Sequence, residues 1–181
     1  MKKKRILAMI LAVASCLSLA VSASAANTVA RKATDFRDFD KSAWYAEAVS
    51  AAVDNGLLYG KSSTIIDPSG DMTRAEMAAI INRSFGCYKT ADISQYSDVS
   101  KSKWYYKDVA LAVQMGTYNG RSASSMAPDA PISRQEAMTV VARALELDYD
   151  SYSKTDLSAF SDRSEISNWA LPYVRAMVGA D

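Results

Sequence analysis

The sequence has no histidine, only two cysteines, four prolines and seven glycines among its 181 residues. Without histidine, the usual general bases and zinc sites of hydrolases are absent. The sequence also has no phosphate-binding glycine loop and no nucleophile elbow. A glycosidase would need a pair of catalytic carboxylates, and no pair stands out among the acidic residues. We therefore expect a protein that is not an enzyme, with no catalytic residue, metal or cofactor.

The N-terminal segment has the pattern of a secretory signal peptide. Basic residues 2–5 precede an apolar stretch at 6–21, and Ala23-Ser24-Ala25 has the small-residue pattern of a cleavage site. We predict that residues 1–26 are removed and that the mature chain has no transmembrane segment. A lipoprotein signal processed at Cys16 is the alternative, and the apolar residues that follow this cysteine argue against it.

The charge of the mature chain is nearly balanced. Four of the 21 basic residues and none of the 20 acidic ones lie in the signal segment, so the formal charge becomes 17 − 20 = −3. This value disfavours bulk attraction to nucleic acid, so any recognition of an anion has to be local. Cys87 is then the one cysteine left, which excludes an intramolecular disulfide and indicates a small, partly buried apolar side chain.

The mature chain repeats itself with a period of 60 residues. Residues 36–86 align with 96–146 without a gap and are identical at 15 of 51 positions. Residues 160–181 match the beginning of a third copy. Self-similarity at a fixed period indicates stacked repeats, each too small to bury its apolar face alone. We predict repeats at 36–86 and 96–147 and an incomplete third repeat at 160–181.

Each complete repeat is predicted to be a helix, a structured loop and a second helix, which gives an all-α fold. Ser42 and Ser102 have the position of N-caps for the first helices. Gly56 and Gly116 have the position that follows the end of a helix.

Apolar side chains recur at helical spacing in every predicted helix. Three tryptophans begin the stripes of the first helices and are interpreted as core anchors: Trp44, Trp104 and Trp169. In the second helices we expect the inward-facing residues to extend to Phe85 and Leu145. The loop at 57–71 is expected to contain a short strand pair near Ile65 and Ile66.

Both second helices open with the same short motif, Thr73-Arg74-Ala75-Glu76 and Ser133-Arg134-Gln135-Glu136. A hydroxyl residue three positions before a glutamate is a capping box. The box does not explain the arginine, because the helix dipole disfavours a cation at this end. An anion held there would meet both the dipole and the guanidinium. Arg74 and Arg134 are therefore candidate ligand-binding residues, with an exposed salt bridge as the alternative.

In combination these features resemble the S-layer homology (SLH) domain. An aromatic-x-Asp motif at 36–38, Trp44, two glycines four residues apart, Pro68 and the Thr-Arg-Ala-Glu motif follow one another in the order typical of that family. The second copy keeps this order and departs from the last motif at Ser133 and Gln135. The resemblance covers nearly all of the mature chain.

The resemblance implies both a fold and a function. Such domains usually occur in threes, form a pseudo-threefold helical bundle and hold exported proteins on the bacterial envelope without a covalent bond. Their ligand is an anionic secondary cell-wall polysaccharide, typically with ketal-linked pyruvate, and some members contact peptidoglycan-associated polymers. We expect a secreted cell-surface protein with such a partner. The alternative is a protein–protein interaction or S-layer assembly module, including self-association, without direct glycan binding.

Carried over to this sequence, the resemblance implies that the binding grooves use the arginines of the two motifs, two Gly-Lys/Arg-Ser loops and nearby acidic and aromatic residues. The candidates are Arg74, Arg134, Lys61, Ser62, Arg121, Ser122, Asp38, Asp98, Trp44 and Trp104. Lys61 and Arg121 are balanced between ligand contact and simple solvation. Asp38 and Asp98 are interpreted as turn residues that also touch sugar.

Two further arginines, Arg83 and Arg143, lie late in their helices, where the dipole favours a cation, and are interpreted as structural. For Arg74→Ala and Arg134→Ala the sequence predicts weaker wall binding with a nearly unchanged melting temperature.

Overall fold

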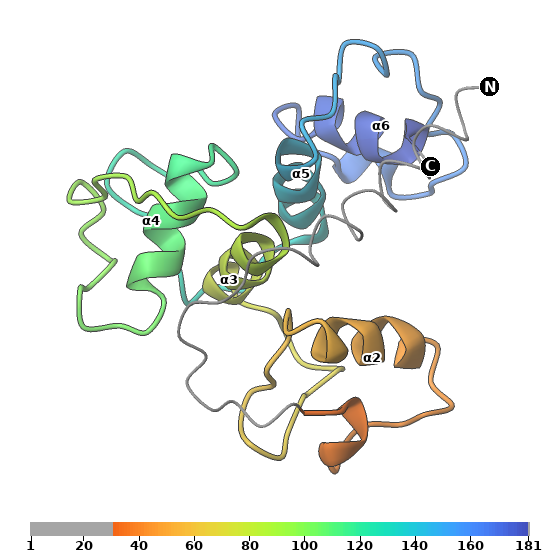
Figure 1. The fold of residues 1–181 in the computed structure, drawn as a ribbon. Helices are drawn as coiled ribbons and strands as arrows, with labels where there is room; N and C mark the ends of the chain where they lie inside the picture. The colour runs from red at the N-terminus through yellow and green to blue at the C-terminus, as the bar shows by residue number, and fades with distance from the viewer. Residues whose placement is uncertain (1–30, 181) are drawn as a thin grey trace. The chain divides into compact units, whose positions relative to one another are not determined.

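The computed structural model describes residues 31–180, and within this range the chain contains only helices and loops (Figure 1). The helices are η1 (Ala33–Asp35), α2 (Ala46–Asp54), α3 (Arg74–Phe85), α4 (Tyr106–Gln114), α5 (Arg134–Ala144), η2 (Arg163–Glu165) and α6 (Leu171–Gly179), where η marks a 3-10 helix. The predicted all-α class of tandem helix-loop-helix repeats is confirmed. The predicted signal peptide, residues 1–26, lies outside the described residues.

Helices pack between repeats rather than within one. Figure 1 shows α4 alongside α3 and α6 alongside α5, and α3 also contacts α5. The main core lies between α3, α4 and the loops of the second repeat. Its buried side chains include Ala78, Ile81, Ile93, Tyr105, Val109, Tyr118, Met126 and Val140. Because the first helix of one repeat covers the second helix of the repeat before it, the apolar face of α3 depends on the following repeat.

The interpretation of the tryptophans as core anchors is wrong. Trp44 is 94%, Trp104 60% and Trp169 51% exposed, whereas the neighbouring Tyr105 is only 1% exposed. The Tyr105 hydroxyl donates to the Asp129 carboxylate at 2.8 Å. Burial, and after it this carboxylate, raises the pKa of Tyr105 to about 12. In the second repeat, Tyr105 therefore fills the core position that the sequence assigned to Trp104.

The first helices begin later than predicted, at Ala46 and Tyr106. Ser42 is not an N-cap, because its N–H and hydroxyl donate to the Asp40 carboxylate at 2.8 and 2.7 Å. Ser102 makes the equivalent local contact with Ser100, at 3.0 Å between the hydroxyl oxygens. A side chain that bonds its own turn competes with helix formation. The tryptophans consequently precede the helices and do not share their buried faces.

The predicted helix ends are partly confirmed. Gly56 and Gly116 follow the C-caps of their helices with positive φ, 67° and 71°, as expected at that position. Phe85 and Leu145, expected to face inward, are exposed instead, because each lies at the end of its helix. The strand pair near Ile65 and Ile66 is also wrong, since the described residues contain no strand.

One helix end carries a residue that is poorly suited to its conformation. Glu146 has φ of 51°, and the matching residue of the first repeat is Gly86, with φ of 71°. A side chain in the left-handed region costs about 1 kcal/mol. We expect Glu146→Gly to raise the free energy of unfolding by up to about 1 kcal/mol, measured by urea denaturation. The control is Gly86→Ala, which should lower the free energy of unfolding by about the same amount. No atom lies within 4 Å of the added Cβ, so the loss would come from the positive φ alone. A loss of stability in Glu146→Gly would contradict the argument.

Candidate functional site

Both predicted capping boxes are present. The Thr73 hydroxyl accepts from the Glu76 N–H at 3.2 Å, and the Glu76 carboxylate accepts from the Thr73 N–H at 2.8 Å. In the second repeat the Ser133 hydroxyl accepts from the Glu136 N–H at 3.3 Å, with a return bond of 2.8 Å. The boxes bring each motif glutamate to the start of its helix, where it can also meet cations from elsewhere.

Arg74 is buried between the two repeats, with 5% of its surface exposed. Its Nε donates to the Met126 carbonyl at 2.9 Å, and its two terminal nitrogens reach Glu136 (3.0 Å) and the Asn119 carbonyl (3.1 Å). The guanidinium also lies over the Tyr118 ring, 5.1 Å from its centroid. All of these partners belong to the second repeat, so Arg74 joins the repeats, and the alternative of an exposed salt bridge does not describe it.

The N-terminus of α3 is capped by the second repeat as well. The N–H of Arg74 donates to the Ala130 carbonyl at 3.0 Å, and that of Ala75 donates to the Pro128 carbonyl at 2.9 Å. These carbonyls take up donors that a helix leaves free at this end. The sequence predicted a bound anion at this helix start. In the structure the two carbonyls and the Glu136 carboxylate provide the negative charge there instead.

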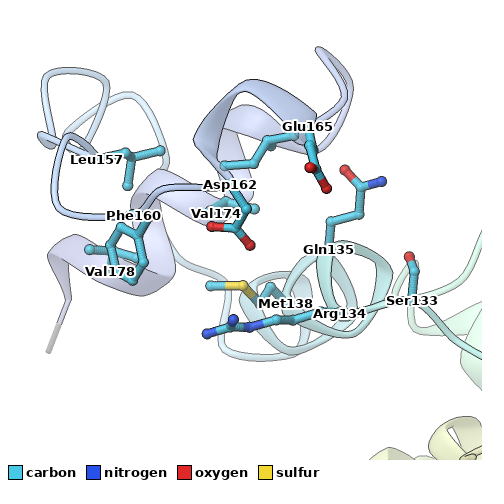
Figure 2. A pocket seen from close by; sticks show the side chains of 11 residues that line it. Ser133, Arg134, Gln135, Met138, Leu157, Phe160, Asp162, Glu165, Val174 and Val178 are labelled. Carbon is cyan, nitrogen blue, oxygen red and sulfur yellow. The ribbon is translucent and has the colours of Figure 1, made fainter.

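Arg134, the repeat counterpart of Arg74, is in a different environment. It is exposed, and its side chain makes no hydrogen bond or ion pair among residues 31–180. It lines a cavity of about 260 Å³ at the start of α5. Figure 2 shows its side chain running beneath Met138, with the Asp162 carboxylate above and the apolar Val178 to one side. We call this the α5–α6 cavity.

A second cavity, of about 390 Å³, lies where the two repeats meet, and we call it the repeat-2 groove. It is lined by Arg74, Thr117, Tyr118, Asn119, Gly120, Arg121, Glu136, Thr139, Val140, Arg143 and Trp169. Arg121 donates to both carboxylate oxygens of Glu136 at 3.1 Å. Burial alone would raise the pKa of Glu136, but the bonds from Arg121 and Ser133 and the nearby guanidinium charges outweigh it and lower that pKa.

The equivalent cavity of the first repeat, about 470 Å³, is the repeat-1 groove. It is lined by Trp44, Tyr45, Val49, Leu58, Tyr59, Gly60, Lys61, Ile66, Asp67, Pro68, Gly70, Asp71, Met72, Glu76, Ala79, Ile80, Arg83 and Trp104. The Lys61 ammonium donates to both carboxylate oxygens of Glu76, at 2.6 and 2.7 Å, and to the Asp71 carbonyl at 3.2 Å. Each groove thus pairs a loop cation with a motif glutamate.

Asp38 and Asp98 hold the loops in shape. Asp98 accepts the N–H groups of Met126 and Ala127 at 2.9 and 2.7 Å and the Ser125 hydroxyl at 2.7 Å. Asp38 makes the equivalent backbone bonds, the first of which is the main reason that its pKa is lowered. Partial burial would raise the pKa of Asp98, but its three donors outweigh that effect and lower it. The turn interpretation therefore describes both residues, which line neither groove.

The remaining candidates divide between loop geometry and grooves. The hydroxyls of Ser62 and Ser122 accept N–H groups of their own loops, at 3.2 Å from Thr64 and 3.3 Å from Ser124. Trp44 and Trp104, which were candidates for contact with sugar, both line the repeat-1 groove.

The groove residues that were not among the candidates include Arg83, Arg143 and Trp169. The two arginines make the structural contacts expected of them, since each lies over a tyrosine ring, at 4.3 Å from Tyr59 and 4.8 Å from Tyr173. They also face the grooves. Their equivalence at a spacing of 60 residues was the signal that could have identified them.

Two general features of the described residues bear on function. No helix among residues 31–180 is long and apolar enough to cross a membrane. The same residues contain no group of three or more acidic, histidine or cysteine side chains arranged to hold a metal ion.

Comparison with known proteins gives a consistent result. Residues 35–78 and 95–138 match the family model of the S-layer homology domain. The chain is 34% identical, over 91% of its length, to the Surface-layer 125 kDa protein of Lysinibacillus sphaericus, and 29% identical over 78% to Exoglucanase XynX of Acetivibrio thermocellus. It is 26% identical over 92% to an endoglucanase of Bacillus sp. (strain KSM-635). These matches cover 14%, 13% and 18% of the three relatives, so the chain spans less than a fifth of their length.

Proposed function

We propose that this chain, which belongs to the S-layer homology domain family, is a secreted cell-surface anchoring module that attaches to the bacterial envelope by binding an anionic wall polysaccharide. The acidic group of that polymer is proposed to be a ketal-linked pyruvate on a neutral sugar. We propose no catalytic role, since the two enzymes named above share only 13% and 18% of their length with this chain.

The observation that carries this proposal is the repeat-2 groove. The guanidinium groups of Arg74 and Arg121 both pair with the Glu136 carboxylate, and Arg143 lines the same groove. A planar guanidinium can bind a carboxylate through two parallel hydrogen bonds. Trp169 lines the same groove, and its exposed ring offers a flat apolar surface to the apolar face of a sugar. A carboxylate on a sugar ring would use both features.

The proposal predicts selective binding to walls that keep their anionic polysaccharide. We expect the purified chain to sediment with wall sacculi of Lysinibacillus sphaericus, and to lose most of this binding when the polysaccharide is first extracted with acid. The reason is that charge-assisted hydrogen bonds, each of about 1.5–3 kcal/mol, would be lost with the pyruvate. High salt should weaken binding to untreated walls, because salt screens partly exposed charges.

The result that contradicts the proposal is equal sedimentation with extracted and untreated walls. The control for catalysis is an assay for released reducing sugar, in which we expect none above background.

A protein-docking or assembly role is the second candidate, and the α5–α6 cavity favours it. There the exposed Arg134 lies beside apolar side chains such as Met138 and Val174, a combination that suits a peptide better than a sugar. This candidate predicts binding to extracted walls or to a second copy that Arg134→Ala weakens. The polysaccharide proposal places the acidic sugar in the repeat-2 groove, which Arg134 does not line. In contrast to the expectation from the sequence, it therefore predicts no effect of Arg134→Ala on binding to untreated walls.

A further inference from the structure

The two grooves occupy equivalent positions in the repeats but differ in charge. Eight pairs of residues, 60 positions apart, line them, and four of these pairs are polar or charged in both grooves: Tyr59/Asn119, Lys61/Arg121, Glu76/Glu136 and Arg83/Arg143. Each groove also receives a tryptophan from the segment that follows its repeat, Trp104 in one and Trp169 in the other. The differences between the grooves therefore stand out against a shared framework.

The repeat-2 groove has an excess of positive charge. Arg74, Arg121 and Arg143 face one carboxylate, Glu136, which gives a formal charge of 3 − 1 = +2. Donors are also left over in this groove. Among the described residues, the Arg143 side chain makes one hydrogen bond, from a terminal nitrogen to the Tyr173 hydroxyl at 3.3 Å. One terminal nitrogen of Arg121 makes none. An incoming carboxylate would find free donors without breaking an existing pair.

The repeat-1 groove has the opposite balance. Lys61 and Arg83 face three carboxylates, those of Asp67, Asp71 and Glu76, which gives 2 − 3 = −1. The three protons of the Lys61 ammonium match its three acceptor atoms, two on Glu76 and one on the Asp71 carbonyl. No arginine of another repeat lines this groove. A carboxylate entering it would meet like charges, and it would have to displace Glu76 to reach the Lys61 ammonium.

The repeat-1 groove is better suited to an uncharged ligand. Trp44 and Trp104 both line it and are largely exposed. Carboxylates such as Asp67 and Asp71 accept hydrogen bonds from sugar hydroxyls at no electrostatic cost. Burial of the apolar face of a sugar ring against an indole adds a hydrophobic contribution that does not depend on ligand charge.

We infer that the two grooves divide the polysaccharide between them: the repeat-2 groove binds the acidic sugar, and the repeat-1 groove binds an uncharged sugar. This inference rests on the proposed function and assigns one acidic group to each chain. Occupation of both grooves by one polymer would increase the overall affinity through effective concentration.

The test uses a matched pair of variants and a matched pair of ligands. The variants are Arg83→Gln and Arg143→Gln, which alter equivalent residues with similar packing against a tyrosine ring. The ligands are a wall-polysaccharide fragment that carries pyruvate and the same fragment after removal of the pyruvate, with binding followed by isothermal titration calorimetry. With the pyruvylated fragment we expect Arg143→Gln to lower the affinity at least 10-fold and Arg83→Gln to lower it no more than 3-fold. With the depyruvylated fragment we expect the two variants to differ by less than 3-fold.

A second pair of variants keeps the test valid if either variant of the first pair misfolds. Arg121→Gln and Lys61→Gln alter partly exposed residues, so both should fold, and the same order of affinities is expected. Trp104→Ala should weaken the binding of the depyruvylated fragment by at least 3-fold. The division between grooves would be overturned if Arg83→Gln and Arg143→Gln, and likewise Lys61→Gln and Arg121→Gln, lowered the affinity for the pyruvylated fragment equally. It would also be overturned by a stoichiometry of two pyruvylated fragments per chain. Either result would leave the proposed function intact. Failure of the unaltered chain to bind either fragment would instead contradict the proposed function.

Discussion

Replacing Arg74 by alanine is expected to lower the free energy of unfolding by about 3–5 kcal/mol. Removal of one member of a buried ion pair usually costs this much, because the remaining charge and acceptors lose their partner. Here the loss would affect the Glu136 carboxylate and the buried carbonyl of Met126. Since marginally stable domains have only about 5–15 kcal/mol in total, the variant should denature at a much lower urea concentration.

Arg134→Ala is the matched control, because the repeat places the same residue in the same motif on an exposed surface, and its side chain makes no hydrogen bond among residues 31–180. Its free energy of unfolding should change by no more than about 0.5 kcal/mol. Arg74→Lys should be intermediate, since an ammonium keeps the charge but cannot reach three acceptors in a plane. A change of less than 1 kcal/mol in Arg74→Ala would show that the inter-repeat bonds contribute little.

This expectation revises the prediction made from the sequence, in which both arginine variants kept their melting temperature. For Arg74 the structure indicates a joint between repeats, so weaker wall binding in Arg74→Ala would follow from a deformed groove as readily as from a lost ligand contact. The variants that isolate ligand binding are therefore those of Arg121 and Arg143, which line the repeat-2 groove without joining the repeats through buried carbonyls.

The features of the fold that could be predicted depend on residues close together in the sequence. A capping box can be recognised from a hydroxyl residue and a glutamate three positions apart, and the end of a helix from a single glycine. The core position at Tyr105 could not be predicted in this way. Trp104 and Tyr105 are adjacent and both aromatic, so a shift of the helix start by a few residues decides which of them is buried.

The environment of Arg74 could not be predicted because its acceptors are 45, 52 and 62 residues away in the chain. The sequence presents Arg74 and Arg134 as equivalents, yet one meets the loop of the second repeat and the other meets residues 157–178. An internal repeat identifies equivalent positions in the sequence. The residues that surround each position differ, because a different segment packs against each repeat. The same reason explains why the two grooves differ in charge.

Asp98→Ala is the second variant for which we expect a large effect, a loss of about 2 kcal/mol. The carboxylate accepts three hydrogen bonds from residues 125–127, and charge-assisted bonds are worth about 1.5–3 kcal/mol each when shielded from water. We expect less than their sum because the residue is exposed and solvent screens its charge. These bonds also hold Ala127 at φ of 51°, a conformation that alanine adopts only under constraint.

The dependence of stability on pH distinguishes this role from a simple packing role. The pKa of Asp98 in the folded chain lies below its ordinary value of 3.8. A carboxyl whose pKa is depressed by folding contributes stability above the unfolded pKa, and that contribution is lost as pH falls through the folded pKa. Between pH 5 and about pH 3, the unaltered chain should therefore lose more stability than Asp98→Ala does, and the difference between the two should shrink. Asp150→Asn, which alters a carboxylate without a side-chain hydrogen bond among residues 31–180, should follow the unaltered chain at every pH. A constant difference in the free energy of unfolding between the unaltered chain and Asp98→Ala across this range would contradict this role. It would mean that the carboxylate charge does not stabilise the loop at residues 125–127.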